Sequence, residues 1–416
     1  MNKIITDPVH GNLILDLKDR HDLFLSKIIE SSLFQRLRYI KQQGAMDFIF
    51  PGSTHSRYLH SIGVLHISKL FHRYTDLLND QEDYKLLTTI GLIHDLGHGP
   101  FSHVTELIQH NLLGTYICHE EWLLRILKEN SEIRKIIVDE YGEYFLEKIM
   151  FVINDNGNNK IKLLYSSQVD IDRLDYLLRD NYYSGIKNGT FDIIAIINNM
   201  RFFKKNKKIM IYFKEDNVYD LVEFFYARFS NYSNITGSYK AVSIRGMFII
   251  FFKNIIKEQK DNSYLPSKYF CMLINGNTIS LEEYLMTNDS SVMNFLMNFS
   301  GKELESIAKD IINTNLYPCF EIKGLTENLN LLLDEYMVGN NMMATYKRDF
   351  IGYDSKKSEI YIKSSSNEMI ELSQYSQHMK ILSELQNKIY VVIKPSNVNE
   401  VLYELKNKGF NLIKRL

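Results

Sequence analysis

The chain has 416 residues, 45% of them hydrophobic, which is enough for one large domain with a sizeable core and a smaller second domain. A formal net charge of −1 excludes a strong overall field for gathering nucleic acid, so nucleic acid is not indicated as a partner. Three scattered cysteines exclude a disulfide framework. With no long apolar run to suggest a signal peptide or membrane span, we expect a cytoplasmic protein without a membrane partner.

The first clear element is a helix over 56–78, within an N-terminal region predicted to be mostly helical up to about residue 250. Arg57, His60 and Val64 recur at spacings of three and four residues, which places them on one stripe of a helix. The stripe begins with polar residues and continues with apolar ones. We therefore expect Arg57 and His60 to face inward, where a cation and an imidazole need partners.

A second, nearly all-apolar helix is predicted over 86–96 and leads into the densest group of histidines. His94 and Asp95 close this helix, and the run from His94 to His103 holds two more histidines. His94 and His98 share a face if the helical turn continues. An adjacent imidazole and carboxylate suit a divalent metal, and nearby imidazoles suit proton transfer near neutral pH. The cluster predicts metal-assisted hydrolysis.

A third helix is predicted around 167–181. Asp172, Tyr176 and Asp180 are spaced by four residues and share one face, while leucines cover another. This pattern, taken alone, is typical of a helix with a solvated polar face.

The remaining chain is predicted to add smaller units. Residues 201–213 indicate a β-hairpin whose basic tip is expected to be solvated. Segments 359–363 and 388–394 indicate strands, and 397–408 indicates a helix. We expect a mostly α fold, a helical bundle with a small β-hairpin and a C-terminal α+β appendage. The predicted domains are a core over 1–250, a helical extension over 251–340 and a small domain over 341–416.

A metal-dependent hydrolase needs about four protein ligands, with open positions for water and substrate. The candidates are His60, His94, Asp95 and a distal acid. Asp172 is the best distal acid because it opens a polar helical face beside Arg173. A lone His-Asp dipeptide is weak evidence, but a histidine, a His-Asp pair and an aspartate on three helices are much stronger.

This order of residues resembles the H…HD…D signature of the HD-domain phosphohydrolases. It is most similar to the deoxynucleoside triphosphate triphosphohydrolases of the SAM-and-HD-domain branch, without the SAM domain. The resemblance covers roughly residues 3–240, and the spacing from Phe34 to His60 matches without a gap. The resembling segments are 7–11, 34–42, 50–52, 55–64, 94–103, 119–120 and 170–176.

The resemblance implies an HD-domain helical bundle with a defined chemistry. His60, His94, Asp95 and Asp172 would hold an iron-, zinc- or manganese-type ion, and Mg²⁺ would join on the substrate phosphates. Water would attack the α-phosphorus of a deoxynucleoside triphosphate (dNTP), releasing deoxynucleoside and intact triphosphate. A metal suits this step because it lowers the pKa of bound water and neutralises phosphate charge.

The resemblance also implies a role for each residue around the metal. The phosphate-binding cations would be Arg57, Arg173 and Arg228, although a buried structural ion pair is the alternative for Arg57 and for Arg228. The acid–base group would be His98, His103, Glu106 and His119, with Glu106 in place of an aspartate. The substrate sugar would be selected by Gln42, Tyr176 and Asp180. Gln43 replaces a leucine, and Thr236 and Ser238 replace a Tyr-x-His motif.

Activated members of the family bind a guanine nucleotide at a subunit interface. Lys3, Glu30, Gln35 and Arg38 occupy the matching positions, so the resemblance implies activation by GTP or a dNTP and assembly of a homo-oligomer, probably a tetramer. An exposed ion pair is the alternative interpretation of Glu30 and Arg38.

Two other functions remain open. One is a different HD phosphohydrolase, such as a nucleotidase, cyclic-dinucleotide phosphodiesterase or nuclease, although the sugar-selecting set argues against it. The other is a nucleotide-sensing module without turnover, although the complete ligand set argues against decay of activity.

Overall fold

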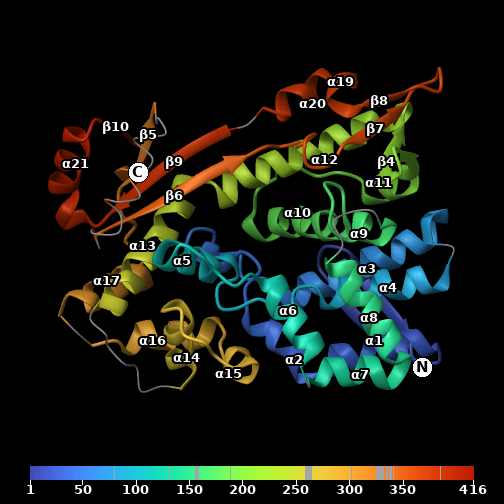
Figure 1. Ribbon diagram of the computed structural model, residues 1–416, viewed down its shortest axis with the longest axis horizontal. Helices are drawn as coiled ribbons and strands as arrows, with labels where there is room; N and C mark the ends of the chain where they lie inside the picture. The colour runs from blue at the N-terminus through green and yellow to red at the C-terminus, as the bar shows by residue number, and fades with distance from the viewer. Residues whose placement is uncertain are drawn as a thin grey trace.

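The computed structural model describes the chain except residues 79, 130, 155–158, 188, 258–264, 301, 325–331, 334, 335, 337–339, 341 and 385. The described chain is mostly α-helical with small sheets, as the sequence predicts (Figure 1). None of the described helices is long and apolar enough to cross a membrane.

The centre of the N-terminal half is helix α3 (Arg57–Tyr74), which contacts both α4 (Gln81–Ile93) and α10 (Ile171–Ser184). Its buried residues include Val64, Ile67 and Phe71, in agreement with the predicted apolar stripe. The further helices are α1 (Arg20–Glu30), α2 (Ser32–Arg36), α5 (His103–Leu113), α6 (His119–Lys128), α7 (Glu132–Tyr141), α8 (Glu143–Asn154), α9 (Lys160–Tyr165), α11 (Ile193–Asn199), α12 (Val218–Asn231), α13 (Tyr239–Lys257), α14 (Leu265–Ile274), α15 (Leu281–Leu285), α16 (Asp289–Asn298), α17 (Lys302–Ile312), α19 (Leu372–Tyr375), α20 (Gln377–Leu382) and α21 (Val398–Asn407).

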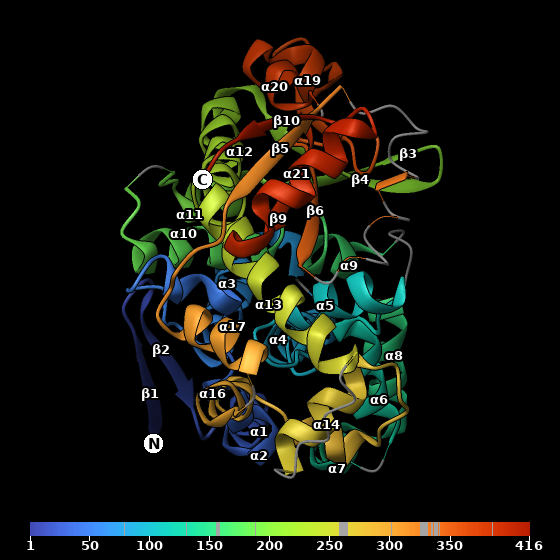
Figure 2. The same cartoon turned by 90° about the vertical axis from the view of Figure 1, so that its left-hand side faces the viewer.

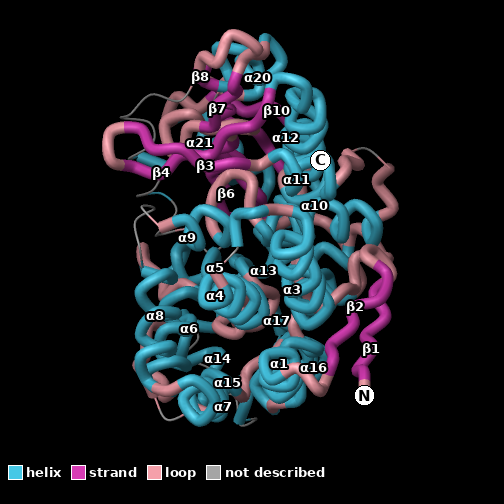
Figure 3. Tube along the Cα trace, turned by 90° about the vertical axis from the view of Figure 1, so that its right-hand side faces the viewer, coloured by secondary structure: helices cyan, strands magenta, loops and turns pink. Residues whose placement is uncertain are grey.

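In the described part of the chain, the strands form three sheets. The antiparallel pair β1 (Asn2–Asp7) and β2 (Gly11–Asp16) lies at the opposite end of the molecule from α19 and α20 (Figure 2). The other strands gather at one end (Figure 3). They form two four-stranded sheets, ordered β10-β5-β9-β6 and β3-β4-β7-β8. Their bounds are β3 (Arg201–Lys205), β4 (Lys208–Lys214), β5 (Cys319–Lys323), β6 (Met343–Phe350), β7 (Ile360–Lys363), β8 (Met369–Glu371), β9 (Gln386–Ile393) and β10 (Asn411–Lys414).

A second hydrophobic core joins the helical body to the first of these C-terminal sheets. Helix α13 packs against β6 and β9, which lie beside it in Figure 1. Gly246 permits this approach, because a Cβ there would lie 2.6 Å from Cβ of Val392 on β9. The C-terminal residues are thereby fixed over the helices.

The predicted elements differ from the observed ones at several places. Strands β1, β2 and β6 were not predicted. The predicted hairpin is present as β3 and β4, but the helix predicted over 86–96 ends at Ile93, and the residues from His94 to Gly97 form turns. Strand β5 lies within the segment expected to be a helical extension, and it pairs with β9 and β10. Strand pairing thus crosses the predicted boundary at 340, and residue 341 itself lies outside the described part. The three-domain division stays a prediction.

Candidate metal and nucleotide site

Four side chains from three places in the fold converge at the heart of the helical body. His60 lies one turn into α3, His94 caps the end of α4, Asp95 follows it, and Asp172 lies in the first turn of α10. The Nε2 atom of His60 lies 3.0 Å from Oδ1 of Asp172 and 3.6 Å from Oδ2 of Asp95. The Nε2 atom of His94 lies 3.3 Å from Oδ1 of Asp95 and 3.9 Å from Oδ1 of Asp172. The predicted ligand set is brought together.

The hydrogen bonds of the two imidazoles fit a metal cation. The Nδ1 atom of His94 lies 2.8 Å from the carbonyl of Gly91, to which it can only donate. The Nδ1 atom of His60 lies 2.7 Å from the Asp175 carboxylate. With Nδ1 protonated on each neutral ring, the two Nε2 lone pairs face each other across 3.2 Å. A cation between these nitrogens and the carboxylates relieves that contact, so the residues fit a divalent metal.

The charges in the cluster also favour a cation. Burial opposes charge on His60, but hydrogen bonds from its ring to Asp172 and Asp175 raise its pKa to about 10. Burial would raise the pKa of Asp95, but the Arg57 guanidinium holds it well below its usual range. Burial lowers the pKa of His94 and keeps that ring neutral. The carboxylates around His60 therefore favour a positive charge at its Nε2 atom, which a proton supplies in the absence of metal and a divalent ion would supply in its place.

A buried hydrogen-bond network lies behind the four candidate metal-binding residues. The sequence patterns did not predict a role for it. Both carboxylate oxygens of Asp175 are used, one by His60 and the other by Nε2 of His10 at 2.7 Å. Arg179 donates to both of them at 2.8 Å and to Asp7 at 2.7 Å. The spacing of Asp175 and Arg179 by four residues is the sequence signal that indicates such a pair. The network fixes the orientation of the His60 ring.

A cavity of about 700 Å³ opens beside the ligands. The predicted residues that line it are His94, Asp95, Asp172, His98, His103, His119, Gln42, Arg57, Arg173, Tyr176, Asp180 and Arg228. The face of α10 that carries Asp172, Tyr176 and Asp180 therefore faces a cavity and is not a plain solvated surface. His60 and Glu106 lie behind this lining and contact residues within it.

The arginines of the cavity differ in their partners. Arg57 is buried and donates to Asp95 at 2.5 Å and to the Ser102 hydroxyl at 2.7 Å, as in the alternative of a structural ion pair. Arg173 is paired with Asp170. Arg228 donates to neutral Gln168 at 3.4 Å and has no carboxylate within ion-pair distance in the described part of the chain. Its charge is the least compensated of the three.

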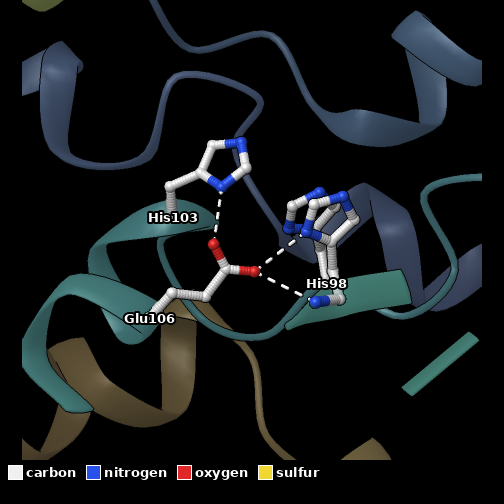
Figure 4. Close-up of side chains that lie close together, drawn as sticks. His98, His103 and Glu106 are labelled. Atoms are coloured by element: carbon white, nitrogen blue, oxygen red, sulfur yellow. Dashed lines mark hydrogen bonds and ion pairs between the residues drawn. The ribbon is translucent and has the colours of Figure 1, made fainter. Parts of the chain in front are cut away.

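The predicted acid–base residues form a second cluster. Glu106 accepts from Nδ1 of His103 at 2.8 Å and lies between His103 and the ring of His98 in Figure 4. Its other oxygen accepts from Nδ1 and from the backbone N–H of His119, at 2.9 and 3.0 Å. The ring of His119 stacks on that of His98, with centroids 3.8 Å apart. The Glu106 carboxylate thus accepts from the imidazoles of both His103 and His119, although the resemblance implies an aspartate at this position.

Protonation differs within this cluster. Burial lowers the pKa of His98 well below its usual range, and the charges of Arg57 and His119 lower it further. Burial also opposes charge on His119, but the hydrogen bond to Glu106 raises its pKa. His119 therefore holds a proton where His98 does not.

The predicted sugar-selecting residues are held in different ways. Asp180 accepts from Nε2 of His55 at 2.9 Å and from the Asn231 amide at 3.2 Å. Burial raises the pKa of Tyr176 to about 12, so its phenol stays protonated. The side-chain oxygen of Gln42 is buried without a hydrogen-bond partner among the described residues.

The residues predicted to bind an activating nucleotide lie outside this cavity. Lys3 donates to Glu30 at 2.7 Å, and Arg38 donates to Gln35 at 2.7 Å while its guanidinium lies 3.6 Å from the centre of the Tyr58 ring. Gln35 donates in turn to the carbonyl of Ile29. The four residues gather near the end of α1 as two contacting pairs.

Comparison with known proteins agrees with this geometry. Residues 57–180 match the HD domain, so the chain contains an HD domain. Together with the cluster of histidines and aspartates, this supports a metal-dependent phosphohydrolase.

Several relatives cover most or part of the chain. YwfO of Bacillus subtilis, an uncharacterized protein, is 27% identical over 92% of this chain and 89% of its own length. The deoxynucleoside triphosphate triphosphohydrolase SAMHD1 homolog of Dictyostelium discoideum is 26% identical over 93% of this chain and 78% of its own length. The human deoxynucleoside triphosphate triphosphohydrolase SAMHD1 is 31% identical, but over 54% of this chain and 40% of its own length.

The fold also matches solved structures. The crystal structure of a phosphohydrolase from Bacteroides thetaiotaomicron superposes with a TM-score of 0.76, at 23% identity, over 95% of this chain and 100% of that one. The similarity therefore extends beyond the HD domain to the C-terminal sheets.

Proposed function

We propose that the protein hydrolyses deoxynucleoside triphosphates to deoxynucleoside and inorganic triphosphate. The observation that carries the proposal is one cavity that joins the His60, His94, Asp95 and Asp172 cluster to basic side chains and to the His119–Glu106 pair. The Dictyostelium and human relatives are named for the same substrate, which supports the proposal.

The phosphate end of the substrate lies at the metal ligands and the arginines. A divalent ion held by the four ligands lowers the pKa of bound water and neutralises phosphate charge. Arg228 binds a phosphate oxygen, because the one hydrogen-bond partner of its guanidinium among the described residues is the neutral Gln168 side chain at 3.4 Å. Arg173 keeps its charge near Asp170 and adds to the positive potential of this wall.

Proton transfer to the leaving 5′-oxygen falls to the second cluster. Glu106 accepts from Nδ1 of His119 and holds the ring. The proton on Nε2, which lies 3.3 Å from the Glu120 carboxylate in the structure, is the one passed to the substrate. A divalent ion held by His60, His94, Asp95 and Asp172 would supply the activated water. The neutral His98 packs against His119 without competing for its proton.

The sugar lies against Gln42, Tyr176 and Asp180. Gln42 and Asp180 present oxygens that accept from a 3′-hydroxyl, and the Tyr176 ring limits the space for a 2′-hydroxyl.

Separation of reaction products tests the proposal against its alternatives. The purified protein is incubated with each dNTP and with Mn²⁺ or Mg²⁺, and the products are resolved by ion-exchange chromatography. Deoxynucleoside with triphosphate is expected. Monophosphate, or cleavage of a cyclic dinucleotide or an oligonucleotide, would instead indicate another HD phosphohydrolase. Tight nucleotide binding without any product would indicate a sensing module.

We further propose that a guanine nucleotide or a dNTP binds at Lys3, Glu30, Gln35 and Arg38 and promotes assembly of a tetramer. The exposed carboxylate of Glu30 and guanidinium of Arg38 offer an acceptor and a donor to a base from neighbouring positions.

A further inference from the structure

The side-chain amide of Gln43 is buried without a hydrogen-bond partner in the described part of the chain. Its side chain lines the cavity, the residue is 8% exposed, and neither its nitrogen nor its oxygen has a hydrogen-bond partner among the described residues. Buried polar side-chain atoms nearly always have a partner, because leaving them unpaired costs stability. An unpaired amide in a cavity wall indicates that a bound ligand supplies its hydrogen bonds.

The backbone around Gln43 holds the amide in place. The N–H of Gln42 donates to the carbonyl of His55 at 3.0 Å, and that of Gly44 donates to Lys41 at 3.2 Å. Gly44 has a φ of +61°, and a Cβ there would lie 2.5 Å from the carbonyl oxygen of Phe101. This segment is therefore packed tightly against the start of α5, and the position of Gln43 is fixed before any ligand binds.

The chemistry of the amide limits what it recognises. A primary amide presents two N–H donors and an oxygen acceptor side by side. A phosphate offers only acceptors at neutral pH and would leave the Gln43 oxygen unpaired. A nucleobase edge offers a donor next to an acceptor, and a sugar hydroxyl offers both on one atom.

We infer that Gln43 is a specificity-determining residue that hydrogen-bonds the nucleoside part of the substrate through an adjacent donor and acceptor. This inference rests on the proposed dNTP hydrolysis and adds to it a residue that discriminates among nucleosides. The neighbouring Gln42, whose side-chain oxygen is also unpaired, extends the same polar strip of the cavity wall.

Kinetic comparison of wild type with Gln43→Met tests the inference, since methionine keeps the length of the side chain and removes both hydrogen-bonding atoms. The kcat/KM is measured for the four dNTPs and, with one base, for the ribonucleoside and 2′,3′-dideoxynucleoside triphosphates. We expect the ratio between at least two of these nucleotides to change about tenfold, which corresponds to one lost hydrogen bond. A change among bases identifies a base edge, and a change among sugars identifies a hydroxyl.

The unfolding temperature separates ligand recognition from a structural role, because loss of a structural amide would lower it. We expect Gln43→Met to unfold at the same temperature as wild type or higher, because it removes an unpaired buried amide. Gln109→Met is the matched control: Gln109 is buried outside the cavity, its oxygen is unpaired, and its nitrogen donates to Leu273. That variant should lower the unfolding temperature and leave the nucleotide ratios unchanged.

Several results would overturn the inference. Nucleotide ratios within about twofold of wild type, or an equal fall for all nucleotides, would show that Gln43 does not discriminate. If wild type turns over no dNTP, the proposed function fails, and equilibrium binding of the same nucleotides then decides the role of Gln43. Equal affinities of wild type and Gln43→Met for every nucleotide, or no binding at all, would overturn it.

Discussion

Glu106 hydrogen-bonds two imidazoles at once, and the protonation of His119 depends on it. Its carboxylate accepts from His103 and His119, and it raises the pKa of His119 against the effect of burial. Because a raised pKa keeps His119 protonated to higher pH, turnover that needs this proton should fall only as the pH rises above the usual histidine range.

Replacing Glu106 with glutamine should make kcat/KM begin to fall at a lower pH than in wild type. The neutral amide no longer stabilises the imidazolium, so the pKa of His119 drops and the limb of kcat/KM against pH should shift down by about 1–2 units. Glu121→Gln, an exposed substitution on the same helix as His119, should leave the profile in place. An unshifted limb in Glu106→Gln would remove His119 from proton transfer.

Gly63 shows how closely α3 and α10 approach behind the metal ligands. A Cβ at this position would lie 1.8 Å from Oδ1 of Asp175 and 2.3 Å from Nη2 of Arg179. Gly63→Ala should therefore disrupt the buried pair that orients His60, lowering the free energy of unfolding by about 3–5 kcal/mol and activity with it.

Chemical denaturation with a parallel assay measures both effects of Gly63→Ala. Ser61→Ala on the same helix removes a buried hydroxyl without a partner among the described residues, and it should change the free energy of unfolding by less than about 1 kcal/mol. Wild-type stability and activity in Gly63→Ala would contradict the role given to the Asp175–Arg179 pair.

The clustering of the candidate metal-binding residues was predictable from sequence, because helical spacing and an adjacent His-Asp pair place side chains such as His60 and Asp95 inward. The supporting residues were less predictable. Asp175 lies three residues after Asp172 and resembles an ordinary surface acid of an amphipathic helix. Only the packing of α10 on α3 buries it, and sequence spacing does not report that contact.

At the scale of elements, the Gln168 side chain, which lies just before α10, hydrogen-bonds the loop between β6 and β7. The Gln168 amide donates to the carbonyls of Asp354 and Ser358, at 2.8 and 2.5 Å, and accepts from the N–H of Asp354 at 2.7 Å. The same oxygen accepts from Arg228. The loop carries Lys357 to the wall of the cavity.

Gln168→Ala should therefore loosen a wall of the cavity. Loss of these hydrogen bonds should cost about 1–3 kcal/mol of stability and raise KM for a dNTP more than it lowers kcat. Gln374→Ala, at an exposed position of the C-terminal region, is the control. Unchanged stability and KM in Gln168→Ala would show that the loop is not held by this side chain.

The C-terminal sheets were the part of the fold that sequence patterns described least well. Strands β7 and β9 and helix α21 were expected, whereas β5 and β6 were not. In β5, Glu321 is buried between Lys323 and Arg415, so the strand lacks the alternation that marks a half-exposed strand. Its partners lie about 70 residues or more away, and local patterns carry no information on such pairing.

At the scale of the whole molecule, we predict that a nucleotide drives assembly of the chain. Light scattering should show a species of four times the 48.9 kDa chain mass when GTP or dGTP is added, with activity rising in parallel. Arg38→Ala should weaken this response, whereas Arg20→Ala, which removes the exposed pair with Glu140, should not. An unchanged mass, with full activity on a single dNTP, would contradict the proposed assembly.

The most direct test of the metal-dependent mechanism is release of inorganic triphosphate from a dNTP by wild type and by Asp95→Ala, with bound metal determined on the same samples. Asp95 contacts His94 and accepts from Arg57, so its removal takes away a ligand while the helices that carry the other three remain packed by their apolar faces. We predict that wild type binds metal and releases triphosphate, and that Asp95→Ala does neither while keeping its helical circular dichroism. Triphosphate release by a helical Asp95→Ala protein would contradict the assignment of the site.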